Sequence, residues 1–195
     1  MDKKQIITIA NANNGYLYSK IIKEYNIQSS LIGRLQKEGT ISKVDRGIYI
    51  TNQGIEDELF INSIKYSRIV YSGETALFLN GLSNKQTLNY EFSIPYGTCT
   101  PKIIGYSVKY VRKKTFQLGI IEVTTPFGNK VRCYDKERCI CDLFIRQDSY
   151  DYEDRIYAIN EYRKYYLNIK KLYNYAKELG VYTEISNVFE VIGWN

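Results

Sequence analysis

Residues 28–50 constrain the fold of this chain more than any other segment. They read QSSLIGRLQKEGTISKVDRGIYI, which predicts an amphipathic helix over 29–38, a glycine stop and a short basic β-hairpin. Two more helices are expected upstream, over 3–12 and 17–25. Helices in this order followed by a basic hairpin are typical of a winged helix-turn-helix, a unit that lays one helix in the major groove of DNA.

The helix expected over 29–38 has an apolar face. Ile27, Leu31 and Leu35 recur at every fourth position, so we expect them to pack on the preceding helices. A hydroxyl side chain would cap the N-terminus of this helix, supplied by either Ser29 or Ser30.

The opposite, polar face carries the side chains that we expect to contact DNA. Gln can form paired hydrogen bonds with adenine, and Arg with guanine, at base edges in the major groove. Gly33 adds no side chain to this face and so permits close approach of a backbone. The candidate DNA-binding residues of this helix and the preceding one are Lys20, Gln28, Ser29, Ser30, Arg34 and Lys37.

The hairpin that follows supplies the expected wing. Gly39 would end the helix, and Asp45-Arg46-Gly47 would form the hairpin turn, where glycine can adopt a positive φ. Lys43 and Arg46 flank this turn, so we expect them to contact DNA phosphates or the minor groove.

The positive charge is concentrated at the N-terminus. The chain has 27 Lys and Arg against 21 Asp and Glu, a net charge of +6, and the first fifty residues hold eight and four of these. A basic segment beside a nearly neutral remainder favours an anionic partner for the N-terminal part.

No segment predicts insertion into a membrane or export. The sequence lacks a run of roughly 18 apolar residues, and its first residues lack the apolar core of a signal peptide. We therefore expect a cytoplasmic protein.

The remainder of the chain predicts an α/β (α+β) domain with a helical last third. We place a winged helix domain over 1–52 and a mixed C-terminal domain over 55–195, separated by a short polar linker. Strands are expected over 69–71, 90–94, 108–112, 120–124 and 129–134. Helices are expected over 56–66, 73–82, 136–148, 153–166, 169–180 and 186–192.

The cysteine pattern argues against a metal centre. Cys99, Cys133, Cys139 and Cys141 lack the two-residue spacing of a zinc knuckle, and the chain has no histidine. We expect reduced, structural thiols and no cofactor. The absence of histidine also removes the commonest general base.

Two other functions remain open alternatives. A metal-dependent nuclease would need clustered carboxylates, and Glu91, Glu122 and Asp135 lie on or near expected strands without the accompanying Lys. We therefore expect that the protein is not an enzyme. The winged helix would alternatively serve as a protein–protein interaction module.

Four segments give the chain a family resemblance. They are GTISKVDRGIYI at 39–50, SGETALFLNGL at 72–82, SIPYG at 93–97 and YDKERCICDLFIRQD at 134–148. In these segments and their order, over nearly its whole length, the chain resembles the AbiEi antitoxins of the AbiE abortive-infection toxin–antitoxin systems, which act in phage defence.

The resemblance implies a function for each part of the chain. The winged helix would bind inverted repeats in its own promoter and repress the operon. The C-terminal domain would counteract a nucleotidyltransferase-like toxin, which in this type IV class need not be bound directly. The protein would be a monomer in solution or would pair on DNA.

The most specific of these segments contains three charged residues, Glu137, Arg138 and Asp142, which are the candidates in the antitoxin domain. Arg138 and Asp142 are four residues apart and would pair on the helix surface. These residues would form either a buried Arg–carboxylate network that joins helix to sheet or a direct antitoxic site, and we favour the network.

Overall fold

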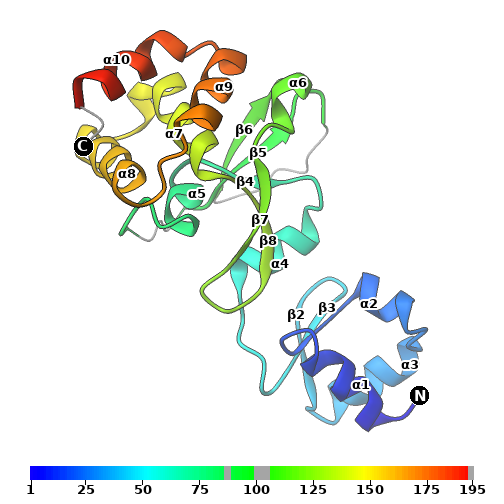
Figure 1. The fold of residues 1–195 in the computed structure, drawn as a ribbon. Helices are drawn as coiled ribbons and strands as arrows, with labels where there is room; N and C mark the ends of the chain where they lie inside the picture. Colours follow the sequence, from blue (N-terminus) through cyan, green and yellow to red (C-terminus); the bar gives the residue numbers. More distant parts are fainter. Residues whose placement is uncertain (86–88, 99–105, 193–195) are drawn as a thin grey trace. The chain divides into compact units, whose positions relative to one another are not determined.

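The computed structural model describes residues 1–85, 89–98 and 106–192. The chain divides into two compact units (Figure 1). The N-terminal unit comprises Met1–Ser67 with the turn Thr124–Lys130, and the C-terminal unit comprises Arg68–Val123 with Val131–Asn195. Helices combine with a mixed sheet, so the expected α+β class is confirmed.

The N-terminal unit has the connectivity of a winged helix. Its elements are α1 (Lys3–Asn11), β1 (Tyr16–Tyr18), α2 (Ser19–Glu24), α3 (Ser29–Lys37), β2 (Ile41–Asp45), β3 (Ile48–Thr51) and α4 (Glu58–Lys65). The three strands form an antiparallel sheet in the order β1-β3-β2. The wing is the β2–β3 hairpin, and its turn contains Gly47 at φ +71°.

Local sequence signals determine where α3 ends but not where it begins. Gly39 adopts φ +67°, and the N–H groups of Gly39 and Thr40 donate to the carbonyls of Gln36 and Leu35. This pair of bonds is a Schellman motif. The expected serine cap is wrong, because Gln28 occupies the N-cap position and makes no side-chain capping bond.

The helix expected over 17–25 is partly wrong. Its beginning is strand β1, and only Ser19–Glu24 is helical. Tyr16 and Leu17 are fully buried and pair with Ile50 and Tyr49 of β3. A three-residue strand buried on both faces has no alternation that a sequence pattern could reveal.

The N-terminal unit extends beyond the boundary expected at residue 52. The apolar side chains of α4 pack against a core formed by Tyr16, Ile48 and Ile50. The rings of Tyr16 and Phe60 meet edge to face with their centroids 5.0 Å apart. Because α4 covers this side of the three-stranded sheet, the unit continues to Ser67.

A buried carboxylate completes the N-terminal unit. Asp57 caps α4 by accepting a hydrogen bond from the N–H of Phe60. Its Oδ2 accepts further bonds from Thr125 Oγ1 at 2.6 Å and Asn129 Nδ2 at 2.8 Å. The same Asn129 receives a bond from Asn14, so one aspartate holds the turn Thr124–Lys130.

The C-terminal unit contains a five-stranded mixed sheet and most of the helices. The elements from residue 68 onward are β4 (Val70–Tyr71), α5 (Gly73–Leu79), β5 (Glu91–Pro95), β6 (Ser107–Val111), α6 (Lys113–Phe116), β7 (Ile120–Thr124), β8 (Lys130–Tyr134), α7 (Lys136–Ile145), a 3₁₀ turn (Gln147–Ser149), α8 (Tyr152–Tyr165), α9 (Ile169–Leu179) and α10 (Tyr182–Ile192). The strand order is β6-β5-β4-β8-β7. Each expected strand occurs with its ends shifted by no more than one residue.

Helix α7 is the centre of this unit. It packs against α5, α8, α9 and α10, and every residue from 137 to 144 is buried. Figure 1 shows α7 to α10 gathered beside the sheet as the helical last third. The expected pattern of one apolar face is therefore too simple, since α7 is covered on several sides.

None of the helices among the described residues is long and apolar enough to cross a lipid bilayer.

Replacement of the buried Asp57 will strongly destabilise the N-terminal unit. Asp57→Ala leaves Thr125 and Asn129 without their acceptor and removes the α4 cap, so we expect a loss of about 3–5 kcal/mol in the free energy of unfolding. Asp2→Ala, which removes the exposed cap of α1, is the control and should cost only about 1 kcal/mol. Urea unfolding followed by circular dichroism measures both, and equal losses would contradict the role of Asp57.

Candidate functional site

The polar face of α3 is open to solvent in the N-terminal unit. The side chains of Ile32 and Leu35 are buried in the core, and Leu31 is partly buried. The residues expected to contact DNA from this helix are all exposed, namely Gln28, Ser29, Ser30, Arg34 and Lys37. Three of them lie at the beginning of α3, the part of a recognition helix that reaches base edges.

Arg34 does not stand alone on this face. Its Nε lies 3.7 Å from Glu38 Oε1, and Lys3 Nζ lies 2.8 Å from Glu38 Oε2. The hydrogen bond from Lys3, aided by the charge of Arg34, lowers the pKa of Glu38. Glu38 therefore stays negative in neutral solution and competes with any anion for Arg34. Glu38 was not among the residues expected at the DNA surface.

The wing and the start of α2 bring a second set of cations together. Lys20 and Arg46 line one cavity of about 640 Å³, together with Lys65 of α4. The turn at Gly47 approaches α2 closely, because a Cβ at this position would lie 2.9 Å from Ser19 Oγ. None of the α3 candidates lines this cavity, and Lys43 is exposed on β2 outside it.

Lys65 supports the wing and was not among the residues expected there. Its Nζ lies 2.7 Å from Asp45 Oδ2, at the base of the wing turn. The hydrogen bond from Lys65 lowers the pKa of Asp45, and the bond to Asp45 raises that of Lys65. Only the packing of α4 on the sheet brings these residues together, so no local spacing signal exists.

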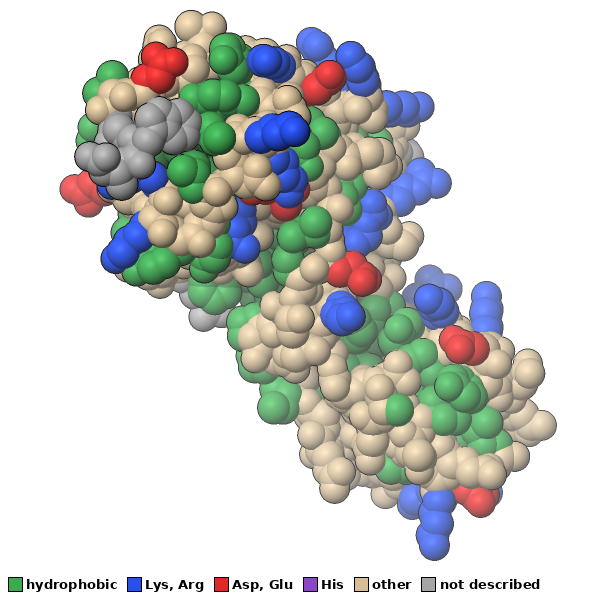
Figure 2. Space-filling model, in the orientation of Figure 1, with side chains coloured by type: hydrophobic (Ala, Val, Ile, Leu, Met, Phe, Trp, Pro, Cys, Tyr) green, Lys and Arg blue, Asp and Glu red, His purple; other side chains and the backbone are tan. Residues whose placement is uncertain are grey.

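Basic side chains project from two places on the displayed face of the N-terminal unit, each with an acidic side chain nearby (Figure 2). On the same view, several Lys and Arg side chains protrude along one edge of the C-terminal unit. The surface charge is therefore grouped and not evenly spread.

The candidates in the C-terminal unit are buried. Glu137, Arg138 and Asp142 are exposed by only 6%, 3% and 6%. Arg138 Nε donates to Asp142 Oδ1 at 2.9 Å, and its Nη1 donates to the carbonyl of Thr115 at 2.6 Å and to that of Leu118 at 3.2 Å. Of the two arrangements considered for these residues, the structure shows the buried network that we favoured, and Arg138 and Asp142 do not pair on the helix surface.

Glu137 belongs to a different network from Arg138 and Asp142. It accepts a hydrogen bond from the Tyr162 hydroxyl and pairs with Lys171 at 2.8 Å. Lys171 also pairs with Asp135 at 3.0 Å, so it joins α9 to the first turn of α7. The two carboxylates hold the pKa of Lys171 above its ordinary value, although burial acts to lower it.

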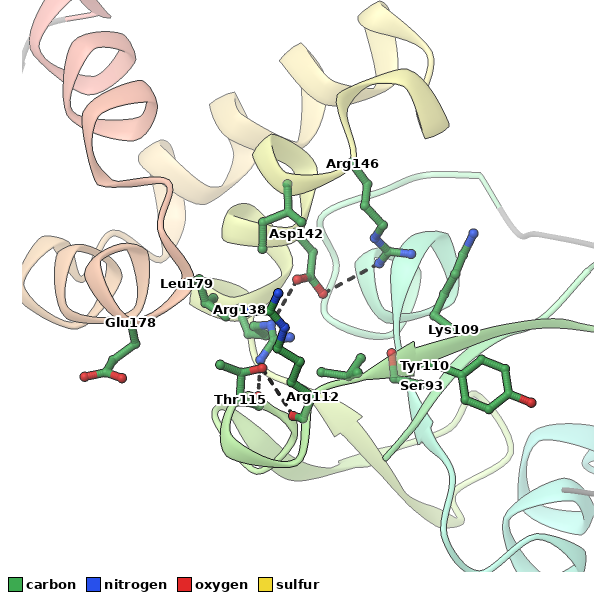
Figure 3. A pocket seen from close by; sticks show the side chains of 12 residues that line it. Ser93, Lys109, Tyr110, Arg112, Thr115, Arg138, Asp142, Arg146, Glu178 and Leu179 are labelled. Carbon is green, nitrogen blue, oxygen red and sulfur yellow. Dashed lines mark hydrogen bonds and ion pairs between the residues drawn. The ribbon is translucent and has the colours of Figure 1, made fainter. Parts of the chain in front are cut away.

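Asp142 connects Arg138 to a second, partly buried arginine, Arg146. Its Oδ2 lies 3.6 Å from Arg146 Nη2, and Arg146 Nη1 lies 2.6 Å from Glu91 Oε1 on β5. Figure 3 shows both guanidinium groups turned toward the carboxylate of Asp142. Arg138, Asp142 and Arg146 line part of a cavity of about 430 Å³ in the C-terminal unit.

The cysteines are part of the core of the C-terminal unit. Cys133, Cys139 and Cys141 are buried and free, and Cys99 lies outside the described residues. Burial raises the pKa of each of the three described thiols, so they stay protonated. Among the described residues, no group of three or more His, Cys, Asp or Glu side chains is arranged to hold a metal ion.

Two of the three carboxylates considered for a nuclease are engaged in other interactions. Glu91 pairs with Arg146, while Asp135 caps α7 and pairs with Lys171. Glu122 lies on β7. The structure thus does not gather the three into one cluster.

The fold defines a class: a winged helix whose third helix, α3, has an exposed polar face, joined in sequence to an α+β unit with a buried arginine–carboxylate network. The chain is similar in fold to the Rv2827c protein from Mycobacterium tuberculosis, with a TM-score of 0.57 and 10% sequence identity over 89% of this chain and 70% of that one. This likeness concerns the fold alone. No protein-family model matches the chain, and no curated protein matches it.

The buried pair of α7 will behave as a unit when it is mutated. Arg138→Met leaves Asp142 buried with one partner fewer, so we expect a loss of about 3–5 kcal/mol in unfolding free energy. The double variant Arg138→Met/Asp142→Leu should lose less than the sum of the single variants, because neither charge then remains unpaired. Urea unfolding of the four proteins measures this coupling. Strictly additive losses would show that the pair is not coupled.

Proposed function

We propose that this protein is a DNA-binding autorepressor and antitoxin that acts in the cytoplasm. Its N-terminal unit binds inverted repeats in its own promoter, and its C-terminal unit counteracts a nucleotidyltransferase-like toxin. The observation that carries the DNA-binding part is the exposed polar face of α3, at the recognition position of a winged helix.

The arrangement of side chains supports separate roles at the DNA: some residues would contact base edges and others would contact phosphates. Gln28, Ser30 and Arg34 lie on the helix that would enter the major groove, where Gln and Arg can each bind a base edge through two hydrogen bonds. Arg46 at the wing turn and Lys20 at the start of α2 are exposed cations suited to phosphates. Inverted repeats fit two protomers bound symmetrically.

The antitoxin part rests on the resemblance to the AbiEi family. The segment most specific for that resemblance, 134–148, contains the central helix α7. Because Glu137, Arg138 and Asp142 are buried there, we assign them a role in stabilising the fold and not in direct contact with a toxin. The surface that opposes the toxin must then consist of other, exposed side chains of the C-terminal unit.

A mobility shift with DNA from upstream of this protein's own gene tests the proposal. The comparison is with scrambled DNA at about 50 and 200 mM salt, because phosphate contacts alone weaken steeply with salt. Specific retention of the promoter fragment at both salts is the expected result. If the protein released the promoter fragment and the scrambled fragment equally at the higher salt, the proposal of a sequence-specific repressor would be overturned.

Removal of the recognition arginine and of the wing arginine should have different effects. We expect Arg34→Ala to weaken operator binding by roughly 1–3 kcal/mol and to relax the base preference at one position. Arg46→Ala should weaken binding to all sequences and reduce the salt dependence. Lys170→Ala, an exposed site on α9, controls for the loss of one positive charge. Unchanged affinity in both arginine variants would show that α3 and the wing do not form the DNA-binding surface.

Removal of the carboxylate beside Arg34 should strengthen DNA binding. Glu38→Gln releases Arg34 from its ion pair and removes a negative charge near the phosphates, so we expect a several-fold tighter complex. Glu24→Gln, exposed on α2, is the matched control for the charge change. Titration by fluorescence anisotropy measures both variants. A weaker complex for Glu38→Gln would show that the ion pair is needed to position Arg34.

A further inference from the structure

The cavity beside α7 carries more positive than negative charge. It lies in the C-terminal unit, has a volume of about 430 Å³ and is lined by residues of β6, α7 and α9 and by the segment that joins β6 to α6. The charged side chains that line it are Lys109, Arg112, Arg138, Arg146, Asp142 and Glu178. The proposed function assigns no role to this cavity.

Two carboxylates, Asp142 and Glu91, neutralise Arg138 and the partly buried Arg146. Asp142 is shared by Arg138 and Arg146, and Glu91 binds Arg146 at 2.6 Å. Lys109 lies 3.9 Å from the same Glu91 oxygen, a distance too long for a hydrogen bond. The three cations Arg138, Arg146 and Lys109 thus share two carboxylates, which leaves one positive charge unbalanced.

Arg112 adds a second uncompensated charge. Its guanidinium makes no hydrogen bond or ion pair within the described parts of the chain, and its side chain is exposed. The lining carboxylate Glu178 lies 3.7 Å from Lys114, so that anion already has a partner. Figure 3 shows Arg112 extending from the end of β6 toward Arg138 and Asp142.

The buried cations are held in place before any ligand arrives. Arg138 is fixed by the carbonyls of Thr115 and Leu118 and by Asp142. Burial acts to lower the pKa of Arg138, but the charge of Asp142, its hydrogen bond and the neighbouring Tyr134 together outweigh burial, so the pKa is raised. A cation that is already ordered loses little conformational entropy when it binds an anion.

These features favour a phosphate group over other anions. Guanidinium groups match phosphate oxygens with two parallel hydrogen bonds, and a phosphate dianion balances the two excess charges of Lys109 and Arg112. Val111, Ile145 and Leu179 supply apolar lining for the remainder of a small molecule. The volume lies in the range of small-ligand pockets, which run from about 300 to 1,000 Å³.

We propose that this cavity binds the phosphate group of a small phosphorylated ligand. Lys109 and Arg112 supply the unbalanced positive charge that contacts the phosphate, and Arg138 and Arg146 supply positive charge that is already held in place by Asp142 and Glu91. The phosphate group could belong to an inorganic anion, such as phosphate or pyrophosphate, or to a nucleotide. The proposal is independent of DNA binding, because it concerns residues of the C-terminal unit alone.

Isothermal titration calorimetry of the full chain tests it with pyrophosphate, AMP, ATP and adenosine. We expect at least one of the phosphorylated compounds to bind saturably, with a stoichiometry of one molecule per chain. Adenosine should not bind. Tighter binding of ATP or AMP than of pyrophosphate would identify a nucleotide as the source of the phosphate, and the reverse order would identify an inorganic anion. Absence of saturable binding by all three phosphorylated compounds would overturn the proposal.

Variants connect the binding to the cavity. Lys109→Met and Arg112→Met should each weaken the tightest compound at least about tenfold, as expected for loss of a charge-assisted hydrogen bond. Lys170→Met, which removes the same charge from exposed α9 outside the cavity, should bind as the unchanged protein does. Circular dichroism melting checks that each variant is folded. Equal affinities in all three variants would overturn the assignment to this cavity.

Discussion

The C-terminal unit depends on the burial of charged residues in α7. A helix that is covered on several sides must satisfy each charge internally, because a buried unpaired charge costs several kcal/mol. Asp142 meets this constraint by binding Arg138 on its own helix and Arg146 one turn later. Through Glu91 and the carbonyls of Thr115 and Leu118, the two arginines then connect α7 to β5 and to the α6 region.

The same constraint explains why the cavity is positive. The network near α7 uses its carboxylates to balance the arginines that hold the fold, and Lys109 and Arg112 lie at its edge without a strong partner of their own. In the N-terminal unit, carboxylates also pair with cations near the proposed DNA surface: Glu38 with Lys3 and Arg34, and Asp45 with Lys65. In both units the residues that stabilise the fold also set the charge that a ligand would meet.

Much of the N-terminal unit could be predicted because its signals are local. Gly39 and Gly47 permit the positive φ that ends α3 and turns the wing, and both positions were expected. Strand β1 could not be recognised, since its three residues are stabilised by pairing with a strand more than 30 positions away. Helix α4 was expected as a helix, but its assignment to this unit depends on contacts of Phe60 that its sequence pattern does not specify.

The sequence by itself determined most of the helices and strands, the α+β class and the position of the basic face of α3, because periodicity, glycines and charge act within a few residues. It did not indicate strand β1 or the short helix α6. Only the tertiary structure decided the partners of the charged residues. Arg138 and Asp142 are four residues apart whether the helix is exposed or buried, and the surrounding helices place them in the interior. Likewise, Lys65 meets Asp45 only through packing between distant elements. The same is true of Lys109 on β6 and Arg112 directly after this strand, which are close in sequence but reach Arg138 and Asp142 of α7 only in the folded unit.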